Sequence, residues 1–387
     1  MSYFLALDAG TTSTKVILFD KDGHSLATSI QEYHLLTPAE DWVELEPDQY
    51  WQACLDGIHQ VLSNSAIHPD AIAALSVSSQ GETLIALDGA GRPLRPAIVW
   101  LDNRAKEEAL HVAKSFDPDA FYQVSGLPEV IPTWPACKIL WLRNHEPAVS
   151  ARTKKYLLVE DYLLYRFSGR FATEGSVSTT TGYFDIRSGE WWPEMLGFLG
   201  LSSESLPTLY RSGQVIGTVV PEAARETGLS TRTRIVTGAM DQVAAAVGSG
   251  NIAPGIVTET TGTALVLAAT VDQPTYDPSK RFPCYYHALP GRYLLIPYCQ
   301  TAGMVLKWFR DQFGQEEMAR AQDSGRDPYD LLGELAAVVP PASDGLVLLP
   351  HLTGSTSPHF NPGREVSILA SPWLIPRGIL YALLWRQ

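Results

Sequence analysis

The sequence is short of the residues and patterns that mark several protein classes. Only four cysteines occur, far apart and without a CxxC pair, so neither a disulfide framework nor a zinc site is indicated. The nine histidines show no HxxxH or HExxH spacing, which argues against a zinc enzyme. No apolar run approaches the length of a membrane span, and the N-terminus lacks the basic region of a signal peptide. We therefore expect a cytoplasmic protein with reduced thiols and no membrane partner.

Positive charge is scarce as well. The 387 residues carry 29 Lys and Arg against 42 Asp and Glu, which gives a formal net charge of −13. This balance argues against nucleic acid or an anionic membrane as the main partner. A hydrophobic content of 45% and a charged content of 18% are typical of globular proteins. The length is sufficient for two domains with separate cores.

Residues 5–20 contain a polar turn between two apolar runs of β type, residues 5–7 and 16–19. Glycine permits close backbone approach and successive N–H groups form a concavity that binds anions, so the turn suits a phosphate chain. A carboxylate at its entrance fits a magnesium ion held largely through water. An ordinary hairpin with a polar turn is the alternative. The predicted contacts are Asp8, Gly10, Thr11, Thr12, Ser13 and Lys15, with Asp8 beside the magnesium ion.

Residues 256–269 repeat the pattern of apolar strand, Thr/Gly turn and apolar strand. Two such hairpins far apart in one chain predict two similar half-molecules with a phosphate chain gripped between them. The sequence contains no GxxxxGK[ST] run, which argues against the P-loop class. The second turn predicts further phosphate contacts at Thr261, Gly262 and Thr263.

Six segments occur in the order found in the FGGY carbohydrate kinases, a family of the actin/sugar-kinase/Hsp70 ATPase superfamily, and the chain resembles that family. The resemblance implies an α/β fold with two actin-like ATPase (ribonuclease H-like) domains facing a central cleft. It also implies phosphorylation of a sugar or polyol hydroxyl, on a ketose such as xylulose or a related polyol. ATP and Mg²⁺ would be required, and members are often homodimers. The segments are residues 8–15, 78–88, 96–104, 137–147, 238–250 and 258–264.

The chain is expected to divide near Pro254 and Gly255, which interrupt the pattern before the second hairpin. This gives an N-terminal sugar-binding domain over residues 1–250 and a C-terminal ATP-binding domain over residues 251–387. Family members usually continue through a Gly-rich turn that holds adenine, so we expect the second domain to be incomplete. One alternative function is therefore a catalytically inactive, truncated remnant that binds sugar without phosphorylating it. Another is an actin- or Hsp70-like ATPase that binds protein, against which the predicted sugar site argues.

Asp241, in the run GAMDQ, is the candidate general base for phosphoryl transfer to an alcohol. It follows the end of a predicted strand, where Gly238 and Ala239 are expected to leave room for substrate. Gln242 is placed to hydrogen-bond a substrate hydroxyl. From the residues alone, Asp241 could equally cap the helix that follows. The family resemblance implies that it deprotonates the acceptor hydroxyl.

Gln80, Gly81 and Glu82 follow another apolar strand and form the predicted sugar-binding turn. An amide and a carboxylate can accept or donate hydrogen bonds to several hydroxyls, and glycine removes bulk between them. The run is similar to the Gln-x-Glu-Thr of glycerol kinase, whereas xylulose kinases usually carry Met-His at the positions of Gly81 and Glu82. A solvated turn carboxylate is the alternative for Glu82.

Trp100 is expected to end a strand over residues 98–100, where its ring faces either a sugar or the core. Asp102 or Asn103 is expected to cap the next helix. Arg104 is expected to be a structural ion-pair partner.

Lys138 and Trp141 belong to a signature that the resemblance assigns to helix packing. On the nucleotide side, the resemblance places Gly303 and Lys307 near ATP, although a solvated helix lysine is the alternative for Lys307.

Overall fold

The computed structural model describes residues 2–261, 265–299, 302–340, 347–349 and 367–369, which belong to two compact units. The first unit contains the described residues of Met1–Ile256 together with Ala269–Leu295, and the second contains those of Val257–Ala268 and Ile296–Gln387. No helix among the described residues is long and apolar enough to cross a membrane.

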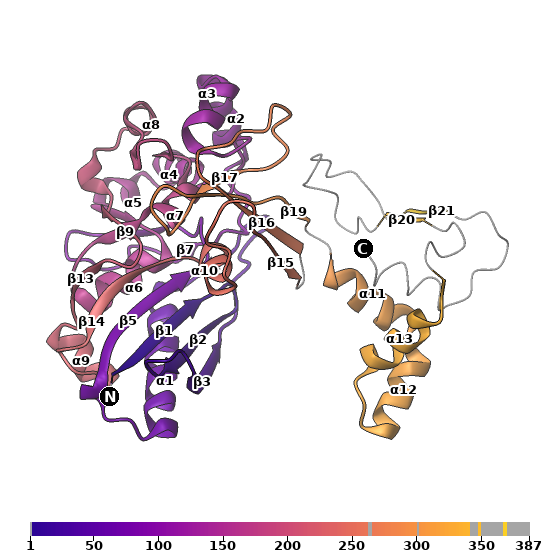
Figure 1. The fold of residues 1–387 in the computed structure, drawn as a ribbon. Helices are drawn as coiled ribbons and strands as arrows, with labels where there is room; N and C mark the ends of the chain where they lie inside the picture. Colours follow the sequence, from indigo (N-terminus) through magenta and orange to yellow (C-terminus); the bar gives the residue numbers. More distant parts are fainter. Residues whose placement is uncertain (1, 262–264, 300–301, 341–346, 350–366, 370–387) are drawn as a thin grey trace. The chain divides into compact units, whose positions relative to one another are not determined.

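A six-stranded sheet forms the centre of the first unit (Figure 1). Its middle strands β1, β5 and β14 run parallel, while β2, β3 and β13 add antiparallel partners at the two sides. The strands expected near residues 5–7 and 16–19 are both present. In sheet order the six strands are β13 (Val215–Thr218), β14 (Arg234–Met240), β5 (Ile72–Ser79), β1 (Tyr3–Ala9), β2 (Ser13–Phe19) and β3 (Ser25–Glu32).

Alternation of side chains builds the core beneath this sheet. Leu5, Leu7 and Ala9 of β1 are buried and the residues between them are less so, as expected for a strand that is covered on one face. Three helices that contact one another cover the core, α1 (Pro47–Ser65), α6 (Val159–Ser168) and α9 (Pro221–Thr227). Helix α1 begins at Pro47, whose fixed φ suits the first position of a helix.

The remaining elements of the first unit surround this core. The short strands are β4 (Glu44–Leu45), β6 (Ile85–Leu87), β7 (Ala97–Ile98), β8 (Lys155–Leu157), β9 (Ala172–Glu174), β10 (Phe184–Asp185), β11 (Glu190–Trp191) and β12 (Thr208–Tyr210). The helices are α2 (Lys106–Ser115), α3 (Pro118–Ser125), α4 (Pro135–His145), α5 (Pro147–Arg152), α7 (Gly175–Ser178), α8 (Pro193–Leu199) and α10 (Asp241–Gly248). Three-residue 3₁₀ turns are η1 (Pro69–Ala71), η2 (Thr179–Thr181) and η3 (Ser203–Ser205).

The segment Ala269–Leu295 returns to the first unit after the chain has entered the second. Its strands β17 (Cys284–Tyr286) and β18 (Tyr293–Leu295) pair antiparallel, and β18 also pairs with the end of β16 (Leu265–Val271). The side chains of Cys284 and Tyr293 form a small core with Phe184 and Ile186.

The second unit contains β15 (Val257–Thr261), the start of β16 and β19 (Tyr298–Cys299), so strands flank the second turn as predicted. Gly262 and Thr263 lie outside the described residues. Phe309, Leu332, Ala336 and Val339 form the core of the helical part. The other elements are α11 (Gly303–Phe313), α12 (Gln315–Ser324), α13 (Pro328–Ala337), β20 (Val347–Leu349) and β21 (Ser367–Leu369).

Glycine is needed at position 238 for a different reason from the expected one, which was room for substrate. The pairing of β14 with β5 shifts register between Val236 and Ala239, and a Cβ atom on Gly238 would lie 1.8 Å from the carbonyl oxygen of Val77. The space beside Gly238 is therefore occupied by the neighbouring strand rather than left for substrate. Glycine is required at this bulge because the two backbones approach so closely.

We predict that Gly238→Ala lowers the free energy of unfolding by about 2–3 kcal/mol, because the strand must move away from β5. Urea denaturation measures the change. Gly197→Ala is the matched control, since no heavy atom lies within 4 Å of the added Cβ. In helix α8 the control should be neutral or stabilise by about 0.5–1 kcal/mol. An equally small effect of Gly238→Ala would contradict the close approach.

Candidate active site

The ends of three parallel strands bring the predicted polar residues together. Ser79 at the end of β5 pairs with Ala9 of β1 on one side and with Met240 of β14 on the other. Asp8 and Asp241 therefore emerge at the same edge of the sheet, on either side of the turn that follows Ser79. This edge is where polar side chains can leave a parallel sheet and face a ligand.

The first predicted phosphate turn is a hairpin tip held by its carbonyl groups. The hydroxyl of Tyr33 donates to the carbonyl of Gly10 (2.6 Å), and the Tyr33 amide donates to the carbonyl of Thr12 (2.9 Å). The amide of Gly10 donates to the carbonyl of Ser13 (3.0 Å). Because these carbonyls are engaged by the protein, the tip is suited to present N–H and hydroxyl groups to an anion.

Asp8 and Lys15 face each other at the base of this tip. They pair across the β1–β2 ladder, and Lys15 Nζ lies 3.6 Å from Asp8 Oδ2, with about half of each side chain exposed. An exposed pair at this distance stabilises the fold little. Both charges are therefore available to a ligand.

Asp241 is the first residue of helix α10, and its N-cap is Met240. Its Oδ1 accepts a hydrogen bond from the Gln242 amide (2.6 Å). Burial raises the pKa of Asp241 to about 6; the Gln242 hydrogen bond and Lys15 oppose this rise, and Asp8 adds to it. A carboxylate with a pKa near neutrality can accept a proton at physiological pH, which capping alone does not require.

Glu82 occupies a strained turn next to Asp241. Its backbone has φ of 55°, a left-handed conformation that is uncommon outside glycine. Burial raises the pKa of Glu82, the charge of Lys138 opposes the rise, and the negative charge of Asp241 increases it. Glu82 is therefore a partly buried carboxylate within the field of Asp241, which disfavours the alternative of a solvated turn residue.

Gln80 and Gly81 lie deeper than expected. The side chain of Gln80 is buried and donates to the hydroxyl of Tyr50 (2.8 Å), while its Oε1 has no hydrogen-bond partner among the described residues. A Cβ on Gly81 would lie 2.6 Å from Cγ2 of Thr180, so the room beside Gly81 is filled by Thr180. An unpaired buried amide oxygen is costly unless a ligand or water satisfies it.

Trp100 lies in a turn, because strand β7 ends at Ile98 rather than at residue 100 as expected. Its amide donates to Oγ1 of Thr83 (3.1 Å). Its indole Nε1 donates to Oγ1 of Thr11 (2.9 Å). Trp100 thus connects the turn that follows β5, through Thr83, with the tip of the β1–β2 hairpin, through Thr11.

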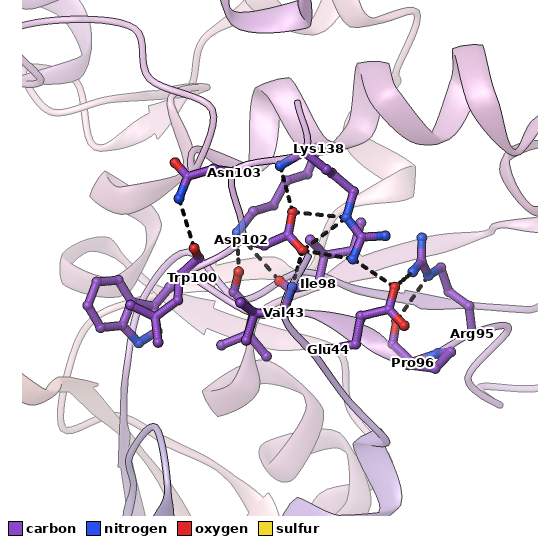
Figure 2. Close-up of polar contacts among 12 residues, drawn as sticks. Val43, Glu44, Arg95, Pro96, Ile98, Trp100, Asp102, Asn103 and Lys138 are labelled. Atoms are coloured by element: carbon purple, nitrogen blue, oxygen red, sulfur yellow. Dashed lines mark hydrogen bonds and ion pairs between the residues drawn. The ribbon is translucent and has the colours of Figure 1, made fainter. Parts of the chain in front are cut away.

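A buried ionic cluster lies beside this turn (Figure 2). Arg104 Nη2 lies 2.7 Å from Asp102 and 2.8 Å from Glu44, and Glu44 also pairs with Arg95. The guanidinium of Arg104 lies 3.8 Å from the ring centre of Trp42. Arg104 is therefore an ion-pair partner, as predicted, and stacks on an aromatic ring as well.

The expected capping role of Asp102 or Asn103 was wrong. Helix α2 begins at Lys106 with Ala105 as its N-cap. The Asp102 carboxylate instead accepts from the Val43 amide (2.6 Å), 59 residues away, and from Arg104. A buried charge partner outweighs a local cap because an unpaired buried charge is very costly.

Lys138 has the structural role expected for it, in a specific form. The side chain is fully buried, and Nζ donates to the carbonyls of Glu82 (2.8 Å), Val99 (3.0 Å) and Ile98 (3.4 Å). Burial lowers the pKa of Lys138, while nearby carboxylates, Glu82 foremost, raise it. The lysine therefore connects the backbone of Glu82 with that of Ile98 and Val99, just before Trp100.

The predicted nucleotide-side residues belong to the second unit. Thr261 is exposed and its hydroxyl donates to Glu259 (2.8 Å). Gly303 begins helix α11, and Lys307 is exposed on that helix. Their proximity to ATP stays a prediction.

Sequence reasoning missed several residues behind the site. The amide of Gly238 donates to Oε1 of Glu160 (2.9 Å), and the amide of Met240 donates to Oγ of Ser176 (2.9 Å). The Glu82 amide donates to Oγ1 of Thr180 (3.1 Å). For Ser176 and Thr180 the signal in the sequence is the run of Ser and Thr residues over 176–181.

Comparison with known proteins agrees with this site. Residues 3–248 match the model for the FGGY family of carbohydrate kinases, N-terminal domain. Gluconokinase of Bacillus subtilis (strain 168) is 32% identical over 364 residues, covering 93% of this chain and 70% of the relative.

Two crystal structures are also similar. Ligand-bound xylulose kinase from Lactobacillus acidophilus superposes with a TM-score of 0.89 at 26% identity, covering 100% of this chain and 76% of its own. Gluconate kinase from the same organism superposes with a TM-score of 0.88 at 27% identity, covering 99% of this chain and 75% of the kinase.

The chain belongs to the FGGY family of carbohydrate kinases and has the actin-like ATPase fold. It is a carbohydrate kinase, an enzyme that phosphorylates a sugar or polyol with ATP. The comparisons support this activity and do not support the alternative of an inactive remnant.

We predict that Asp102→Asn lowers the free energy of unfolding by about 3 kcal/mol, because the buried Arg104 loses a full charge partner. Chemical denaturation measures the loss. Asp22→Asn is the control, since the Lys21–Asp22 pair is largely exposed and its removal should cost less than about 1 kcal/mol. Similar losses in the two variants would show that the cluster is not a supporting element.

Proposed function

We propose that this kinase transfers the γ-phosphoryl group of ATP to a hydroxyl of an open-chain sugar, polyol or sugar acid, with Asp241 as the general base. The observation that carries the proposal is the position of Asp241 at the shared strand edge, with a pKa raised to about 6. The charges of Asp8 and Lys15 act on Asp241, and the charge of Asp241 acts on Glu82, which supports a shared site.

Each residue has a distinct role in this proposal. Glu82 and Gln242 accept and donate hydrogen bonds to substrate hydroxyls, and Trp100 covers the sugar side of the turn. The orphan Oε1 of Gln80 supports a polar ligand or water next to it. Asp241 then accepts the proton of the attacking hydroxyl while Lys15 offsets charge on the transferring phosphoryl group.

The residues of the first hairpin fit a magnesium–phosphate group. Among the described residues no group of three or more His, Cys, Asp or Glu side chains could hold a metal ion. Magnesium usually keeps several waters and is bound by one or two carboxylates with substrate phosphates. Asp8 would hold the ion through water, and the ion would neutralise phosphate charge.

The similar kinases are named for gluconate and xylulose, so these compounds are the first acceptors to test. The free thiols of Cys54, Cys137 and Cys284 are buried, which supports a reducing, cytoplasmic setting. A homodimer, the boundary near residue 250 and contacts of Thr261, Gly303 and Lys307 with ATP are part of the proposal.

We predict that Asp241→Asn lowers turnover by ~10²–10⁴ while sugar affinity changes only a few-fold, because the proton acceptor is lost. In the wild type, kcat/KM should fall as pH falls through about 6, since the protonated carboxyl cannot accept a proton. Coupled ADP release with gluconate and with xylulose over pH 5–8 gives both results.

The raised pKa of Asp241 also predicts how its ionisation changes the stability of the fold with pH. A carboxyl with a folded-state pKa above its unfolded value stabilises the fold most at low pH and loses this contribution as pH rises through the folded value. Asp241 and Asp161, whose pKa burial raises to about 7, therefore do not promote acid unfolding.

Turnover of Asp241→Asn above about a tenth of wild type would remove Asp241 as the base.

For Glu82→Ala we predict weaker sugar binding and a changed order of preferred acceptors. An unpaired substrate hydroxyl costs ~1–3 kcal/mol, which corresponds to a rise in KM of about 5-fold to 150-fold. The measurement is KM for a panel of gluconate, xylulose and glycerol. Glu129→Ala is a control at another carboxyl whose pKa burial raises. An unchanged acceptor panel would return Glu82 to the role of a turn carboxylate.

A further inference from the structure

Behind the two carboxylates lies a buried run of hydroxyl residues, which we call the hydroxyl segment. It comprises Ser176, Ser178, Thr179, Thr180 and Thr181, each at most 2% exposed. Polar side chains are seldom buried in such density without specific hydrogen-bond partners. Two of these hydroxyls contact the backbone that carries the site, those of Thr179 and Thr181 contact the backbone elsewhere, and that of Ser178 contacts the hydroxyl of Thr173.

Thr180 contacts the turn of Glu82. Its Oγ1 donates to the carbonyl of Val177 (2.8 Å) and accepts from the Glu82 amide (3.1 Å), so the hydroxyl is used as both donor and acceptor. Its methyl group fills the space that a side chain at Gly81 would need. With Lys138 on the Glu82 carbonyl, both polar groups of this strained residue are held by side chains.

Ser176 contacts the end of the strand before Asp241. Its Oγ donates to Oε1 of Glu174 (2.6 Å) and accepts from the Met240 amide (2.9 Å). The Glu174 carboxylate is itself held by the amides of Ser176 and Val177 and by the hydroxyl of Ser212. The hydroxyl of Ser176 is thus oriented by a buried, fully engaged carboxylate.

We propose that the hydroxyl segment holds two positioning residues, Thr180 for the substrate carboxylate Glu82 and Ser176 for the base Asp241. The inference rests on the proposed roles of these two carboxylates. Side-chain contacts with backbone amides set the direction in which Glu82 and Asp241 leave the strand ends. Because one segment holds both, it fixes the spacing between substrate binding and proton transfer.

The segment offers matched controls for the test. Thr181 is equally buried, and its Oγ1 likewise donates to the carbonyl three residues earlier (Ser178, 2.7 Å), but it accepts from Tyr183 rather than from a site residue. Ser178 has a hydroxyl partner in Thr173 (3.2 Å). Thr181→Val and Ser178→Ala therefore remove a buried hydroxyl without loosening the site.

Thr180→Val should raise the dissociation constant of the bound acceptor about tenfold with little change in kcat, whereas Thr180→Ser and Thr181→Val should stay within about twofold. Calorimetry with gluconate and with xylulose measures binding without ATP. In a Glu82→Ala background, Thr180→Val should have no further effect. An equal loss in Thr181→Val, or a loss that persists without Glu82, would overturn the role of Thr180.

Ser176→Ala should change turnover instead of acceptor binding. We expect kcat to fall roughly 10–100-fold with acceptor affinity nearly unchanged, because a misplaced base reacts slowly. Ser178→Ala should retain wild-type turnover. Equal losses of kcat in the two variants, or unchanged turnover in Ser176→Ala, would overturn the role of Ser176.

Amide hydrogen exchange separates this inference from the proposed function. Exchange in the peptide containing Glu82 should quicken in Thr180→Val and not in Thr181→Val, whatever the acceptor. Unchanged exchange refutes the positioning contact. Gly81→Ala approaches the same contact from the opposite side and should give the same exchange result if Thr180→Val does not fold. Suppose instead that exchange quickens in Thr180→Val while Glu82→Ala binds the acceptor as tightly as the wild type. The positioning contact would then stand, and Glu82 would be rejected as a substrate ligand.

Discussion

The site depends on one constraint, the alignment of three parallel strand ends. Ser79 is paired on both sides, with Ala9 and with Met240, so a shift of one residue in either ladder would turn Asp8 or Asp241 to the other face of the sheet. The bulge at Gly238 adjusts the register of β14 just before this edge. Strand pairing therefore determines which carboxylates can meet, before any loop contributes.

Bringing acidic groups together at a partly buried edge has an electrostatic cost. Burial raises the pKa of both Glu82 and Asp241, and each lies within the field of another carboxylate. The cost is reduced by Lys15 beside Asp8 and by Lys138 beneath Glu82. The same crowding that opposes ionisation gives Asp241 the basicity that proton transfer requires.

Local patterns made much of the fold predictable. The hairpin of β1 and β2 and the start of helix α1 at Pro47 follow from side-chain period and from proline's fixed φ. Features set by distant contacts were not predictable. Asp102 pairs with the Val43 amide instead of capping, and the Glu82 amide meets Thr180, 98 residues later in the chain. No short-range rule contains such contacts, because they depend on which segments the completed fold brings together.

The return of Ala269–Leu295 to the first unit has a consequence for biosynthesis. The Tyr286 amide donates to Oγ1 of Thr179, and the ring of Tyr286 lies against Gly175, so this late segment covers the hydroxyl run behind the site. A nascent chain leaves the ribosome with its N-terminus first, and domains generally fold as they are completed. The sheet can form once β14 has left the ribosome, but the layer behind the carboxylates must wait for β17. Until then the hydroxyl segment lacks the contact between Thr179 and Tyr286, so the sheet is complete before the layer behind the active site.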